Sequence, residues 1–136
     1  MSDKPLITKS RVFALAIMKI CKENKFQSVL SNQLLKSGTS IGANVHEANY
    51  AHSKPDFIAK MQIALKECYE TKYWLTLLIE SKELVDNDLL ENCLVLRRML
   101  IASVRTAKRT YITYQTKYVY IMRCFQVTTL YYVKAM

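Results

Sequence analysis

Histidine and cysteine are the side chains in this sequence that most readily support metal binding or nucleophilic catalysis. The 136-residue chain contains His46, His52, Cys21, Cys68, Cys93 and Cys124. No glutamate is followed by histidine three residues later, as a di-iron site in a helical bundle requires, and no cysteines form a Cys-x-x-Cys pair. The cysteines lie among apolar residues, where free cysteine usually acts as a small buried hydrophobic side chain. We therefore expect no catalytic site, metal or cofactor; a pocket joining His46, Glu47 and Glu70 would reverse that expectation.

Basic side chains offer a different chemistry, the binding of phosphates. The chain has 20 basic and 11 acidic residues, a formal net charge of +9. The excess lies at the ends, because residues 1–24 and 109–136 are both rich in lysine and arginine and the second range has no acidic residue. Such an excess favours polyanionic partners through the release of counterions from phosphates. The alternative is that the charge serves solubility alone.

The candidate phosphate contacts belong to two predicted helices, near residues 9–23 and 88–108. They are Lys9, Arg11, Lys19, Lys22, Arg97, Arg98, Arg105, Lys108 and Arg109. If the two helices are neighbours, these side chains form one basic surface. No motif of a common RNA-binding module is present, so we expect contact mainly with phosphate and weak sequence preference. A protein–protein scaffold without direct nucleic-acid contact is the alternative function.

The elements that must position these residues are long helices. The chain has two glycines and two prolines, and 51% of its residues are hydrophobic, a composition that favours few helices over a sheet with many turns. Apolar residues recur at helical spacing over 9–23, 27–51, a range beginning at Ser53, and 88–108. Short links between them predict an all-α domain at residues 1–109, an antiparallel up-down-up-down four-helix bundle.

The third predicted helix has the clearest pattern. Ser53 followed by Asp56 is similar to a capping box, and Pro55 suits a first helical turn. Apolar or small residues then step by four and three over three heptads, as in antiparallel bundles; they are Phe57, Met61, Ala64, Cys68, Thr71, Leu75 and Leu78.

Both glycines of the chain, Gly38 and Gly42, lie one helical turn apart inside the second predicted helix. Glycine costs roughly 1 kcal/mol relative to alanine in a helix interior, so the pair indicates a close approach of another helix. A polar row runs beside them: Ser37, Ser40, Asn44 and Glu47. This row is either a solvated face or an interface. In the second case Glu47 needs a basic partner, for which the candidates are Arg97, Arg98, Lys66 and Lys72.

The tail at residues 110–136 has a different composition, with six of the nine tyrosines and many β-branched residues. Such residues prefer extended structure, so the tail is expected to be extended or irregular, with a continuation of the fourth helix as a further possibility. No stretch of about 18 apolar residues predicts a membrane span, and residues 1–6 lack the build of a secretory signal. We therefore expect a cytoplasmic protein.

Two segments carry a family resemblance: QLLKSGTSIGANVHEA at 33–48 and DFIAKMQIALKECYETKYWLTLL at 56–78. They resemble the bacterial four-helix-bundle proteins encoded in intervening sequences of 23S ribosomal RNA genes, and the resemblance covers about residues 6–109. Ser40, Ile41, Asn44 and Glu47 match the family's second-helix motif, and Ala64, Leu65, Glu67 and Glu70 match its third. The tail has no counterpart there.

The resemblance implies a short bundle that assembles into a ring, typically a pentamer, without established enzymatic activity. It implies an association with ribosomal RNA, which rests on where the family's genes lie. Related accessory proteins of retroelements engage nucleic acid and a reverse transcriptase as basic pentamers. The expected partners are therefore further copies of this chain and RNA or DNA, with no membrane and no small-molecule substrate.

Overall fold

Four α-helices make up most of the part of the chain that the computed structural model describes, which is residues 4–24, 26–85 and 88–134, with side chains as far as residue 123. They are α1 (Pro5–Glu23), α2 (Ser28–Ala48), α3 (Lys54–Glu80) and α4 (Leu89–Lys134). The predicted all-α class is confirmed. α1 begins at Pro5 rather than at residue 9, because a proline in the first turn needs no hydrogen-bond partner for its nitrogen.

The start of α3 is fixed as its sequence predicts. The Ser53 side chain accepts a hydrogen bond from the Asp56 backbone N–H at 3.2 Å. The Asp56 carboxylate in turn accepts one from the His52 backbone N–H at 3.1 Å. These bonds satisfy backbone groups that a helix end leaves without a partner.

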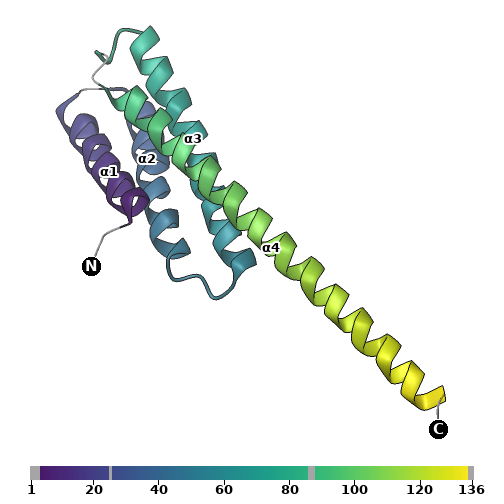
Figure 1. The fold of residues 1–136 in the computed structure, drawn as a ribbon. Helices are drawn as coiled ribbons and strands as arrows, with labels where there is room; N and C mark the ends of the chain where they lie inside the picture. Colours follow the sequence, from purple (N-terminus) through teal and green to yellow (C-terminus); the bar gives the residue numbers. More distant parts are fainter. Residues whose placement is uncertain (1–3, 25, 86–87, 135–136) are drawn as a thin grey trace.

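The helices alternate in direction and each packs against its neighbours in the chain, and α4 also packs against α1 (Figure 1). Among the described residues, the diagonal pairs α1–α3 and α2–α4 make no close contact. This is the predicted up-down-up-down bundle, in which short links force consecutive helices to be antiparallel neighbours.

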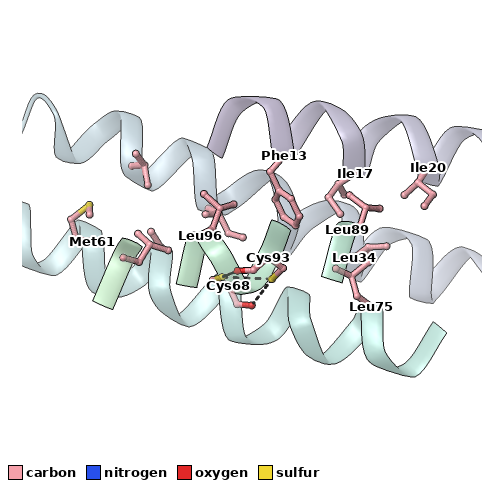
Figure 2. Packing of buried hydrophobic residues seen from close by; sticks show 14 of the residues in the cluster. Phe13, Ile17, Ile20, Leu34, Met61, Cys68, Leu75, Leu89, Cys93 and Leu96 are labelled. Carbon is pink, nitrogen blue, oxygen red and sulfur yellow. Dashed lines mark hydrogen bonds between the residues drawn. The ribbon is translucent and has the colours of Figure 1, made fainter. Parts of the chain in front are cut away.

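The core draws on all four helices, as Figure 2 shows for Ile17, Leu34, Leu75 and Leu96. Each of these side chains is at most 2% exposed, and burial of one such side chain stabilises the fold by about 1.5–3 kcal/mol. The seam predicted on α3 is buried from Met61 to Leu78, whereas Phe57 is half-buried.

The C-terminal tail is neither extended nor irregular, and the further possibility is observed, because α4 continues through the tail as one helix of 46 residues. At about 1.5 Å per residue this helix is about 70 Å long, and its second half projects from the bundle (Figure 1). No glycine or proline follows Pro55. Extending an existing helix avoids the unfavourable nucleation step. This advantage outweighs the preference of the tail's residues for β structure. Within the described ranges, no helix is long and apolar enough to span a membrane.

Candidate nucleic-acid interface

The two glycines hold α1 against α2. A β-carbon added to Gly38 would lie 2.9 Å from Ile17 Cγ2, and one added to Gly42 would lie 3.4 Å from the Ser10 carbonyl oxygen. Ser10 and Ile17 are both buried on α1. The predicted close approach of a second helix is confirmed, and it fixes the position of α1 and its basic residues on the bundle.

The polar row on α2 passes from the core to solvent. Ser37 is fully buried and its hydroxyl donates to the Leu34 carbonyl oxygen at 3.4 Å. Ser40 and Asn44 are half-buried, and the Asn44 amide donates to the Ser40 carbonyl oxygen at 2.9 Å. Ile41 beside them is fully buried. The row is therefore neither a wholly solvated face nor a buried network.

Glu47 ends this row in an exposed ion pair with Lys60 of α3, and its carboxylate raises the pKa of that lysine. The prediction of a different partner is wrong for each of Arg97, Arg98, Lys66 and Lys72. Among the described residues α4 lies diagonally across the bundle from α2, which separates the two arginines from Glu47. Because α2 and α3 are antiparallel, the end of α2 lies beside the first turns of α3, which contain Lys60.

The basic residues predicted on α1 are all exposed: Lys9, Arg11, Lys19 and Lys22. Lys19 Nζ lies 3.9 Å from Glu23 Oε1, and both side chains are more than half exposed. An exposed pair of this kind contributes about 0–1 kcal/mol, so it competes weakly with a phosphate for the lysine.

The basic residues predicted on α4 fall into two environments. Arg98, Arg105, Lys108 and Arg109 are exposed, and Arg98 pairs with the exposed Glu91 at 2.8 Å. Arg97 is half-buried, and its guanidinium carbon lies 5.7 Å from the ring centre of Tyr69 on α3. This position makes Arg97 a packing contact between α3 and α4, less available to a phosphate than the other four.

α1 and α4 lie side by side, as a single basic surface requires. A groove between them is lined by Thr8, Lys9 and Val12 of α1 and by Asn92 and Val95 of α4, among others. A second hollow places the first turn of α1 beside Met99 and Ser103. Since the two helices are antiparallel, residues after Ser103 pass beyond the start of α1. The predicted cations of α1 are therefore distributed along that helix, whereas Arg105, Lys108 and Arg109 form a separate group where α4 leaves the bundle.

The candidate residues predicted from the sequence do not include the basic residues of the tail, because its composition leaves extended, irregular and helical structure open. Glu91 is the last acidic residue of the chain. The basic residues that follow it are Arg97, Arg98, Arg105, Lys108, Arg109, Lys117, Arg123 and Lys134. Lys117 and Arg123 are exposed. The absence of any helix-breaking residue was the feature that indicated one continuous basic helix.

The residues considered for catalysis have separate environments. His46 is exposed and its ring centre lies 5.3 Å from that of Tyr50, whereas Glu70 accepts a hydrogen bond from the Trp74 indole at 3.3 Å. Cys68 and Cys93 are buried together, with 3.7 Å between their sulfur atoms. Within the described part of the chain, no three histidine, cysteine or acidic residues are grouped as a metal ion would need. The Cys124 side chain lies outside the described residues.

Comparison with known proteins places this bundle in a family. The family model described as 23S rRNA-intervening sequence protein matches residues 3–102, so the match ends before the projecting part of α4. A crystal structure from Bacteroides thetaiotaomicron, described as a protein with unknown function from the S23 ribosomal protein family, is 39% identical with a TM-score of 0.70. That alignment covers 73% of this chain and 97% of the other. No curated protein matches significantly. By its sequence and its bundle, the chain belongs to the 23S rRNA-intervening sequence protein family.

Proposed function

We propose that the chain is a non-enzymatic, homo-oligomeric protein that binds RNA phosphates through α1 and through the cations at the point where α4 leaves the bundle. The observation that carries the proposal is that α4 has only basic charges after Glu91. It exposes Arg105, Lys108 and Arg109 where it leaves the bundle. Exposed cations release counterions when they meet a phosphate backbone. The family name makes ribosomal RNA the first candidate ligand.

Self-association is supported by an apolar row on the outside of α1. Val12, Leu15 and Met18 are 59%, 58% and 51% exposed, and their spacing of three keeps them on adjacent turns. A second copy would remove this apolar surface from water. The resemblance implies a ring of five, in which the basic surface would recur around an axis and bind long RNA with increased avidity.

A salt titration with a fragment of 23S ribosomal RNA tests the phosphate contact. The logarithm of the binding constant should fall linearly with the logarithm of salt concentration. Absence of binding at low salt, or a flat dependence, would contradict the proposal. Light scattering tests self-association, because a monomer mass for the wild type would refute it. The double variant Leu15→Glu with Met18→Glu should shift the mass towards that of a monomer.

A protein–protein scaffold is the second candidate, favoured by the same exposed row on α1. The two functions differ in what the Leu15→Glu and Met18→Glu variant retains. A phosphate-binding protein keeps a measurable affinity for RNA after the oligomer dissociates, since its cations remain. A scaffold without nucleic-acid contact has no RNA affinity even as the wild type, and the two substitutions disrupt its interaction surface on α1.

A further inference from the structure

The projecting part of α4 has an exposed surface that the proposed function does not use. We call it the extension surface and define it by Tyr114, Lys117, Tyr118, Tyr120 and Arg123. The three tyrosines are 70%, 63% and 69% exposed, and the lysine and arginine are exposed as well. The surface lies beyond residue 102, where the family match ends. A property of this surface would therefore belong to this chain and not to the matched bundle.

Helical spacing orders the extension surface. Tyr114, Lys117, Tyr120 and Arg123 follow one another in steps of three, so aromatic and cationic side chains alternate along a ridge that winds around about half of the helix. Tyr118 follows Tyr114 by four residues, a distance of about 6 Å along the axis, and it lies beside that ridge. Each ring therefore has a cation within one helical turn.

Alternating aromatic rings and cations fit a ligand that offers flat apolar faces joined by phosphates. We infer that the extension surface binds single-stranded nucleic acid, with bases stacked on the three tyrosine rings and phosphates held by Lys117 and Arg123. Stacking on aromatic side chains needs bases that are not already stacked in a duplex. The inference rests on the proposed function and adds the strand form that is bound and the residues that select it.

Charge argues against a second copy of the chain as the occupant of this surface. The extension of any other copy has the same sequence, in which only basic charges follow Glu91. Two such helices side by side would bring like charges together, which is unfavourable. A polyanion reverses the sign of that interaction while it covers the same tyrosine rings.

The test uses the full chain and two fluorescent probes, a single-stranded oligouridylate and an RNA duplex of the same length. Replacing Tyr114, Tyr118 and Tyr120 together by alanine should weaken binding of the single strand more than about tenfold and leave duplex binding unchanged. Replacing all three by phenylalanine keeps the rings and should restore binding. The matched control is Tyr50→Ala with Tyr73→Ala, because these bundle tyrosines are 69% and 59% exposed; its affinity should equal that of the wild type.

Alanine favours helix, so circular dichroism of the alanine variant should show an unchanged helix content. A triple leucine variant also removes the rings but keeps a larger apolar side chain at each position. Wild-type affinity in the alanine and leucine variants would overturn the inference. An equal loss of affinity for both probes would also overturn it. A fall in oligomer mass at unchanged affinity would overturn it too, because it would identify a second copy of the chain as the occupant. If the wild type binds neither probe at low salt, the proposed function fails as well; if it binds both and the variants change nothing, only the inference fails.

Discussion

Gly38 of α2 lies against Ile17 of α1 so closely that a β-carbon on the glycine would be 2.9 Å from Ile17 Cγ2 and 3.0 Å from Cγ1. Ile17 is fully buried, so its branched side chain has little room to move away. The contact explains why a residue that costs roughly 1 kcal/mol in a helix interior is found there: any larger side chain would separate the two helices.

Gly38→Ala should destabilise the bundle for this reason. Overpacking of a core costs about 1–3 kcal/mol, which exceeds or cancels the roughly 1 kcal/mol that alanine gains in helix propensity. Thermal unfolding followed by circular dichroism measures the difference. In an Ile17→Ala background the Cγ1 and Cγ2 atoms are absent, so the same substitution should be tolerated. Equal effects in both backgrounds would contradict the contact.

Gly42 gives the matched comparison, because the nearest atom to a β-carbon there would be the Ser10 carbonyl oxygen, at 3.4 Å. Gly42→Ala should raise the free energy of unfolding by up to about 1 kcal/mol, because the new β-carbon makes an ordinary contact and alanine has the higher helix propensity. Gly42→Leu places a long side chain against α1 and should cost about 1–3 kcal/mol. An unchanged melting temperature for the leucine variant would refute the close approach at this position.

The glycine contact and the α3 seam were predictable because both follow from helical periodicity, which is local. The partner of Glu47 was not, because it depends on which helices are adjacent and how far one is shifted along the other. The tail shows a second limit of prediction from local sequence. Its tyrosines and β-branched residues favour strands on average, but a helix that has already formed at Leu89 extends through them without a new nucleation step.

Cys68 and Cys93 should be unreactive in the folded protein. Each thiol donates to the other residue's carbonyl oxygen at 3.4 Å, and neither side chain is exposed. The hydrogen bond with Cys68 and burial raise the pKa of Cys93 above its ordinary value, so raising the pH to about 9 should not speed its alkylation. Maleimide labelling read by peptide mass spectrometry should modify the half-buried Cys21 before Cys68 and Cys93, with the buried pair modified only after denaturation.

Ending the chain after Arg109 should leave the bundle folded. Ala107 is the last buried side chain among those described, and every described side chain from 112 to 123 is exposed. The melting temperature should therefore stay within about 2 °C of the full chain, while total helical ellipticity falls. This variant also tests the predicted domain limit at residue 109. Ending after Met99 is the control, because it removes Leu100, Val104 and Ala107 from the core and should abolish cooperative unfolding.

The cations where α4 leaves the bundle should set the salt dependence of RNA binding. Replacing Arg105, Lys108 and Arg109 by glutamine should reduce the slope of log K against log salt by about 0.7 for each phosphate of single-stranded RNA that is no longer neutralised. The matched control replaces three exposed lysines on other parts of the bundle, Lys36, Lys66 and Lys82. Both variants have the same reduction in net charge, so a difference in slope between them depends on position rather than on total charge. Equal slopes would mean that the RNA responds only to the net charge of the protein, and the interface at α4 would then be refuted.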